Sequence, residues 1–536
     1  MRLFRTLALV AGLVLPVTAI PPVAQATIVP ANDVIHIGNG PAVETLDPHK
    51  AGSVYANTVL RELFEGLLSR DAAGNLIPGA AESWTVSPDG TVYTFTLRAD
   101  GRWSDGTPVT AADFVWSWQR AVNPATLPYF TNLLYAVRNA PEILRGELPP
   151  DQLGVRAVDD RTVEVTLSHP DPNLLTFTTH YATYPVHRPS VEQHGAEFTR
   201  PGNLIGNGAY VLTDSVPQSH IQLRKNPHFH DAAKVAIEEV WFHVTDDQNQ
   251  EVKRFRAGQL HVTERVPVTQ MKFVRENLSD RLRIAPMAVA QFVSLNLTRE
   301  PWKSNADLRK ALYLAIDRDG LVRAMDGEQV PAYSLIPPGL AGYVPPDLPY
   351  SRMTQAERDA MARELLAKAG YGPRGKPLTV NLLHTSVETN RRLAVIIAAM
   401  WKQKLGIETV TDNQEFRVIV SRIRQKDFPD LVTRGWRSIA PTYAMEILRR
   451  RDPSNNTGYD SDAFEELMTR AETAVDITES NRLLQQAEAI AMAETAQIPL
   501  YFDTSRRLIQ PNVQGWVDNL EDIHPVRFLS LAPAGN

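Results

Sequence analysis

The chain has 536 residues, a formal net charge of −6 and no cysteine. Its length is too great for one hydrophobic core and predicts two or three domains. The lack of cysteine excludes disulfides, thiol nucleophiles, iron–sulfur clusters and the usual structural zinc sites, and the lack of a dominant basic cluster disfavours a nucleic-acid partner.

The first 26 residues have the pattern of a secretory signal peptide. Two arginines precede an apolar run over residues 7–15, and an Ala-Gln-Ala cleavage motif ends at Ala26. A membrane anchor is the alternative, but a span needs about 20 apolar residues and prolines interrupt this segment. We expect cleavage near Ala26/Thr27 and no lipoprotein anchor, which would need a cysteine. Such an unanchored chain, with 53 basic against 61 acidic residues and a net charge of −8, is predicted to be periplasmic.

The mature chain alternates strand patterns with amphipathic helix patterns, which predicts an α/β fold. Strand patterns occur at residues 34–37, 163–167, 221–223, 292–295 and 378–383. Helix patterns occur at residues 356–369, 389–404 and 463–492, the last as two or more helices. In the first of these, Met361, Leu365 and Leu366 are expected on one face. No glycine-serine linker is present, so we expect domains joined by several chain crossings.

The stretch from Ala80 to Trp118 predicts a strand, a turn and a helix. Apolar residues alternate within residues 92–97, and Thr110 and Asp113 have the spacing of a capping box at a helix start. As a residue string, AAESWTVSPDGTVYTFTLRADGRWSDGTPVTAADFVWSW resembles the signature of the peptide-binding family of bacterial extracytoplasmic solute-binding proteins. These proteins are the receptors of ABC importers.

The resemblance covers nearly the whole mature chain in the family's order. Matching blocks include LDPHK at 46–50, RELFEGLL at 61–68, PGNLIGNGAYVL at 201–212, DLRKALYLAIDRDGLV at 307–322 and RGW at 434–436. The nearest likeness is to oligopeptide and murein-peptide binders. It implies a two-lobed periplasmic binding protein fold of three domains, with a ligand cleft between lobes joined by a hinge. Lobe I would comprise residues 27–64, 189–290 and 507–536, an inserted smaller domain residues 65–188, and lobe III residues 291–506.

The resemblance also implies binding residues. They are Val54, a partner of the ligand backbone in a segment that forms a strand beside the ligand in the family; Tyr129, in the smaller domain; Phe416, lining a side-chain pocket; Arg424, facing ligand carboxylates; and Gly435 and Trp436, framing the ligand's amino end. For Phe416 and Trp436, ordinary core packing remains the alternative.

Several positions depart from the family pattern at the predicted amino-end pocket. Ile439 stands where the oligopeptide binders carry the aspartate that pairs with the ligand's α-ammonium. Arg437 occupies the family's cysteine position, and Val289 occupies the position of that cysteine's disulfide partner. An ammonium buried without a carboxylate is costly, so we expect a ligand that lacks a free amino terminus here. Glu446 could replace the lost acid.

Other polar anchors are also changed. Arg434 lies one place after the family's usual arginine slot, which is Thr433 here. Asn390 aligns with a histidine near the ligand's carboxyl end, and Met287 replaces a pocket tyrosine. The resemblance thus implies that the scaffold is retained while the residues that contact the ligand are substituted. Arg424 and Arg437 are then expected to hold anionic groups.

No motif indicates catalysis or a cofactor. Residues 228–231, HFHD, contain two histidines and an aspartate, but the resemblance places them in a surface turn, so we expect no metal. G-x-S-x-G, HExxH and P-loop motifs are absent, although a triad built from distant positions stays open. We predict a monomeric receptor, not an enzyme, that binds oligopeptides or modified, anionic peptide-like ligands and delivers them to a permease and its ATPases. The alternatives are a binder of a non-peptide anion such as an opine- or sugar-conjugate, a secreted hydrolase, or a periplasmic sensor or chaperone.

Overall fold

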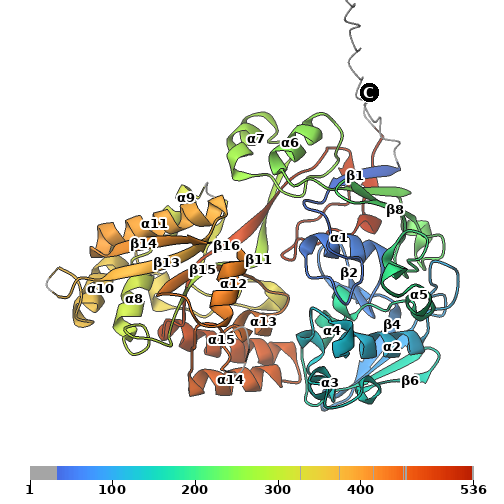
Figure 1. Cartoon of the computed structure of the whole chain (residues 1–536), viewed down its shortest axis with the longest axis horizontal. Helices are drawn as coiled ribbons and strands as arrows, with labels where there is room; N and C mark the ends of the chain where they lie inside the picture. The colour runs from blue at the N-terminus through green and yellow to red at the C-terminus, as the bar shows by residue number, and fades with distance from the viewer. Residues whose placement is uncertain are drawn as a thin grey trace, which may run out of the picture.

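The computed structural model describes residues 33–325, 328–373, 375–414, 416–450, 452 and 455–533. The predicted signal peptide therefore lies outside the described residues. Helices and strands alternate along the chain and form two lobes, joined at the top of the view by long strands (Figure 1). This arrangement confirms the predicted two-lobed α/β fold. None of the described helices is long and apolar enough to cross a membrane.

The sheet of lobe I is assembled from distant parts of the chain. Its strand order is β1-β10-β9-β8, with bounds Val34–Gly38, Glu239–His243, His220–Lys225 and Tyr210–Val216. β1 pairs with β10 in parallel, while the other pairs are antiparallel. Alternate apolar side chains of these strands pack with α1 (Val54–Leu63) in one buried cluster.

The region of residues 65–188 carries a second sheet below lobe I in Figure 1. Its order is β4-β5-β7-β6, with bounds Ala81–Val86, Val92–Leu97, Thr162–Thr166 and Val155–Asp159. The predicted capping box is confirmed at the start of α2 (Ala111–Val122), where the amide nitrogen and Oγ1 of Thr110 donate to Asp113 Oδ2 at 2.8 and 2.9 Å. Phe114 and Trp118 of this helix are fully buried against the sheet.

Lobe III is built on a six-stranded sheet. Its order is β12-β16-β11-β15-β13-β14, with bounds Val330–Pro331, Gln497–Leu508, Leu282–Leu295, Leu431–Arg437, Thr379–Thr385 and Glu408–Gln414. The helices of this lobe are α8 (Ala306–Leu314), α9 (Arg318–Ala324), α10 (Gln355–Lys368), α11 (Glu388–Leu405), α12 (Phe416–Arg424), α13 (Pro441–Glu446), α14 (Asp462–Glu472) and α15 (Ile477–Ala493).

The strands β11 and β16 run from lobe III toward lobe I as one antiparallel ladder (Figure 1). The ladder is regular from Leu282 to Pro286, and its register shifts twice after that, between Pro286 and Ala290 and between Gln291 and Phe292. A break in ladder pairing is where a sheet bends most easily. The predicted domain limits at 290/291 and 506/507 fall within these two strands, so the lobes are joined by continuous strands rather than by a flexible linker.

Most predicted elements coincide with observed ones. Each predicted strand overlaps a strand of the structure, and the predicted helices correspond to α10, α11 and the pair α14 and α15. The predicted face of α10 is wrong in one respect, because Met361 is 40% exposed. The buried positions are Arg358, Ala362 and Leu366, at helical spacing, and Met361 lies one residue off that face.

Candidate ligand-binding site

The candidate site begins at the carboxyl ends of three strands of lobe III. β13 is followed by α11 and then β14, and the chain next passes through α12 to β15, on the other side of β13. β13 is parallel to both neighbours. In open α/β sheets, ligands bind in the crevice outside the carboxyl ends of strands at such a reversal. In Figure 1, α12 lies at this end of the sheet, which faces the other lobe.

The second half of β15 has an open edge. β15 pairs with β11 along its whole length, from Leu431 opposite Leu295 to Arg437 opposite Val289. Its pairing with β13 involves only Leu431 and Val432. Among the described residues, the backbone from Thr433 to Arg437 therefore has no strand partner on its β13 side. Such an edge can add an extended chain as a further strand.

The two faces of β15 carry different residues, because side chains alternate along a strand. Arg434 lies over the ring of Phe292, its cross-strand partner, at 6.0 Å from the ring centre. Trp436, two positions along, shares this face. Gly435 lies on the opposite face against Gln291, and a Cβ at Gly435 would come 2.5 Å from Gln291 Nε2. Any larger residue at 435 would displace that glutamine.

Arg437 is at the end of β15, directly opposite Val289 as predicted. The family's disulfide positions are therefore adjacent across two strands. Arg437 Nη1 donates to the carbonyl oxygen of Glu521 at 3.3 Å. Burial lowers the pKa of Arg437, and the charges of Arg265 and Arg507 add to this effect. The side chain nevertheless remains a cation at neutral pH.

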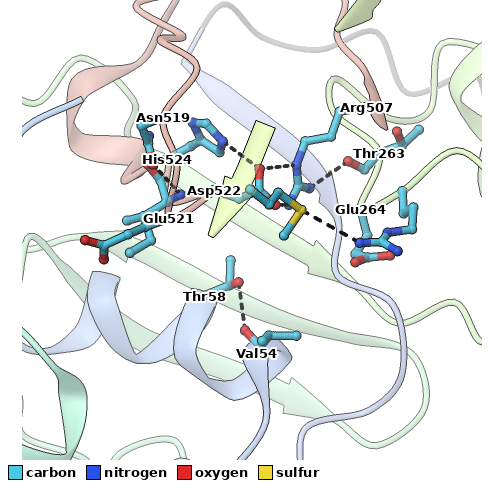
Figure 2. A network of polar contacts seen from close by, with 12 residues as sticks. Val54, Thr58, Thr263, Glu264, Arg507, Asn519, Glu521, Asp522 and His524 are labelled. Carbon is cyan, nitrogen blue, oxygen red and sulfur yellow. Dashed lines mark hydrogen bonds and ion pairs between the residues drawn. The ribbon is translucent and has the colours of Figure 1, made fainter. Parts of the chain in front are cut away.

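Figure 2 shows a polar network around Asp522, which joins the C-terminal segment to the residues around Thr263. Arg507 Nη2 and Asp522 Oδ2 form an ion pair of 2.7 Å, His524 Nε2 contacts Asp522 Oδ1 at 3.0 Å, and Arg507 Nη1 donates to the carbonyl of Thr263 at 3.0 Å. Burial alone would raise the pKa of Asp522, but Arg507 and His524 hold it far below its usual range.

The same network includes two residues with weaker contacts. Arg265 Nη2 lies 3.9 Å from the sulfur of Met287, and Arg265 Nη1 lies 3.9 Å from Asp503 Oδ2. Met287 itself is buried. Arg265 was not identified from the sequence, because no local pattern marks an arginine that approaches the site from a loop of lobe I.

Ile439 lies in an apolar contact between lobe III and the 65–188 region. With Ala440 it joins a cluster that includes Leu133, Phe177 and Ala182. Nearby, Asn173 Nδ2 donates to Thr442 Oγ1 at 3.0 Å in a buried hydrogen bond. The residue that the resemblance aligns with the family's aspartate therefore packs against the 65–188 region.

Trp436 is held next to this contact. Its ring stacks on that of Tyr443 with centres 5.4 Å apart and planes inclined by 23°, and its Nε1 donates to the carbonyl of Tyr443 at 3.1 Å. Tyr443, in α13, was not identified from the sequence. Glu446 follows it, and burial together with Asp452 and Glu472 raises its pKa well above the usual value. Glu446 is thus a poor substitute for an ionised aspartate.

Tyr129 and Val54 face this region from the other lobe. Tyr129 is 63% exposed, and its amide donates to the carbonyl of His49 at 3.0 Å. A Cβ at Gly52 would lie 2.8 Å from the Tyr129 ring, so only glycine permits this approach. Figure 2 shows Val54 on α1 below the polar network.

The expectation that Val54 belongs to a strand is wrong. Ser53 caps α1 through its side-chain oxygen, which accepts from the amide of Ala56, and Val54 is the first helical residue. Its carbonyl oxygen already accepts from Thr58 Oγ1 at 3.0 Å. The Ser and the helix-forming run after it explain the helix start. Val54 is 45% exposed, so its side chain can still contact a ligand.

Three other predicted residues lie on α11 and α12. Asn390, in the first turn of α11, donates through Nδ2 to Oγ1 of Thr385, the last residue of β13, at 2.7 Å. Phe416 begins α12, but its side chain lies outside the described part of the structure. Arg424 ends α12 and is exposed, without an ion pair among the described residues.

The histidine-rich segment 228–231 is a turn after β9, as predicted. His230 Nε2 contacts Glu65 Oε2 at 2.8 Å, and Glu65 also pairs with Arg527 at 2.6 Å. Within the described residues, no group of three or more histidines or acids is arranged to hold a metal ion.

Two lobes joined by a bent strand pair, with an open strand edge where they meet, define a two-lobed solute-binding protein. The model of the bacterial extracellular solute-binding proteins, family 5, matches residues 75–456. The chain belongs to this family. It is 35% identical over 494 residues to the periplasmic murein peptide-binding protein MppA of Escherichia coli, covering 91% of each chain. It is 36% identical to the periplasmic oligopeptide-binding protein OppA of Salmonella typhimurium, covering 91% of this chain and 90% of OppA. The unliganded open form of MppA superposes with a TM-score of 0.82 at 33% identity, covering 93% of this chain and 97% of MppA.

Proposed function

We propose that the chain is the periplasmic receptor of an ABC importer. It binds oligopeptides or modified, anionic peptide-like ligands between its lobes and releases them to a permease driven by its ATPases. The open edge of β15 from Thr433 to Arg437 carries this proposal, because an extended chain can pair with it through main-chain hydrogen bonds. The similarity to MppA and OppA supports the ligand class and the periplasmic location. The proposal includes a monomer, cleaved after Ala26, with the three domains predicted above.

A second candidate is a non-peptide anionic solute on the same scaffold. The observation that favours it is the apolar contact around Ile439, which the resemblance aligns with an ammonium-binding aspartate, on a chain where the cations Arg434 and Arg437 lie on β15. Native mass spectrometry of the purified protein distinguishes the two proposed functions. The bound molecule is then released by denaturation and identified. A released peptide supports the first candidate, and a released non-peptide acid supports the second.

Binding is expected to close the lobes by bending at the irregularity between Pro286 and Ala290 in β11. Small-angle scattering should show a smaller radius of gyration with saturating ligand, and thermal stability should rise by mass action. The control is the same titration with a compound that does not bind. An unchanged radius of gyration at saturation contradicts a receptor that closes on its ligand.

Arg424→Ala is expected to weaken binding by about 2 kcal/mol, the usual cost of removing a hydrogen bond to a charged group. Folding should be unaffected because the side chain is exposed. Isothermal titration calorimetry measures the first effect and thermal unfolding the second. Arg299→Ala, which removes a surface arginine whose contact with Asp427 is 4.0 Å long, is the matched control. Equal affinities of Arg424→Ala and wild type would remove Arg424 from the site.

A further inference from the structure

Arg434 is a partly buried cation without a counter-ion among the described residues. Its Nη1 is shielded from solvent and has no hydrogen-bond partner among the described residues. Its ring contact is with Phe292, at 6.0 Å. Two other arginines have more partners, although Arg318 Nη2 also lacks one among the described residues. Arg507 pairs with Asp522, and Arg318 donates to the backbone carbonyls of Ala332, Pro499, Tyr313 and Ile316.

This arrangement is unfavourable in the unliganded protein. Burial lowers the pKa of Arg434 to about 10, so the guanidinium stays charged at neutral pH. A charge withdrawn from water without a partner destabilises a fold. Unsatisfied buried polar groups are rare in native proteins and cluster at functional sites. A ligand that supplies the missing anion would remove this penalty on binding.

The position of Arg434 on the strand defines what can reach it. An extended ligand that pairs with the open edge of β15 places one residue directly opposite Arg434, with its side chain on the same face and its Cβ about 5 Å away. The short side chain of an acidic residue spans this distance and forms a bidentate pair with a guanidinium. The ligand residue two positions away, on the same face, lies opposite Trp436, whose ring stacks on Tyr443.

We propose that Arg434 is the receptor for a ligand carboxylate carried on a side chain, and that the preferred ligand has this acid two positions from an apolar or aromatic group. The acid pairs with Arg434 and the apolar group packs on Trp436. We infer the anion site from the unpaired guanidinium of Arg434 alone. The two-residue spacing rests on the proposed function, because it requires an extended ligand on β15.

Stability provides the first test, because a structural arginine and an anion receptor respond oppositely to an apolar substitution. Arg434→Met should raise the melting temperature of the unliganded protein by about 2–4 °C, since an unpaired, partly buried charge is removed. Arg318→Met, the matched control, should lower it because four carbonyls lose their donor. A fall in melting temperature for Arg434→Met comparable to that of Arg318→Met would show a structural role and overturn the proposal.

A small dicarboxylate provides the second test. At constant ionic strength, glutarate should raise the melting temperature of the wild type, leave Arg434→Met unchanged and have a reduced effect on Arg434→Lys, which keeps the charge but not the bidentate geometry. Equal shifts in the wild type and in Arg434→Met would place glutarate elsewhere and contradict the assignment.

Matched peptides test the spacing by calorimetry. N-acetylated, C-amidated Glu-Ala-Phe and Phe-Ala-Glu are compared with the same sequences carrying Gln for Glu. At least one Glu peptide should bind about 10–100-fold more tightly than its Gln counterpart, and Arg434→Met should abolish the difference. Equal affinities of the Glu and Gln peptides for the wild type would overturn the side-chain specificity. If no peptide binds while glutarate does, the peptide function fails and the anion site is retained.

Discussion

Asp522→Ala is expected to lower the free energy of unfolding by about 3–5 kcal/mol, the cost of breaking a buried ion pair by removing one partner. Asp522 pairs with Arg507 at 2.7 Å and with His524 at 3.0 Å, and each of these side chains is at most 16% exposed. The variant leaves a buried guanidinium without its counter-ion. Chemical denaturation measures the change.

Asp280→Ala is the matched control, because the Asp280 side chain is 70% exposed and lies 3.7 Å from Arg281. An exposed pair of this kind contributes about 0–1 kcal/mol. If the two variants differ by less than about 1 kcal/mol, the Asp522 network does not stabilise the fold.

The same pair predicts a pH dependence. The pKa of Asp522 is lower in the folded protein than in the unfolded chain, so its stabilising contribution is present above the unfolded value of about 3.9 and is lost as the pH falls below it. The wild type should therefore lose more stability than Asp522→Ala between pH 5 and pH 3. Parallel losses over this window would contradict the expected pairing.

The elements that the sequence predicts correctly are those with a strong local pattern. Alternating apolar residues define β5, and the Thr110–Asp113 spacing marks the start of α2 because the capping bonds are made within four residues. Val54 begins a helix rather than a strand, because the side chain of Ser53 caps the first turn of α1. Met361 shows that a helix face cannot be assigned from apolar residues alone when Arg358 is buried on it.

The binding site is predicted less completely because its contacts join distant segments. The opposition of Val289 and Arg437 follows from the family's paired cysteines and is confirmed by the strand register. The ion pair of Arg507 with Asp522, the approach of Arg265 to Met287 and the stack of Trp436 on Tyr443 depend on tertiary structure. The sequence therefore predicts which residues replace the family's anchors, but not which groups surround them.

We expect a peptide with a free amino terminus to bind the wild type at least about 100-fold more weakly than its N-acetylated form. The position that would carry an ammonium-binding aspartate is Ile439, which packs on Leu133 and Phe177 of the 65–188 region. Arg437, near the same end of the site, is a cation. An α-ammonium buried here would lack a carboxylate, at a cost of several kcal/mol, and about 2.7 kcal/mol corresponds to the 100-fold difference. Calorimetry with free and N-acetylated peptides of one composition measures it.

Ile439→Asp should reverse this preference, because it supplies the missing carboxylate. It should also lower the melting temperature, because it places a charge in the apolar contact between lobe III and the 65–188 region. Ile439→Asn is the matched control. Asparagine has the same shape as aspartate, so this variant loses the same apolar contact without gaining the charge. A gain in affinity for the free amine that is confined to Ile439→Asp would show that the ion pair, and not a loosened contact, determines the choice of ligand. Equal gains in both variants, or nanomolar binding of the free-amine peptide to the wild type, would contradict the assignment of Ile439 to the amino end of the ligand.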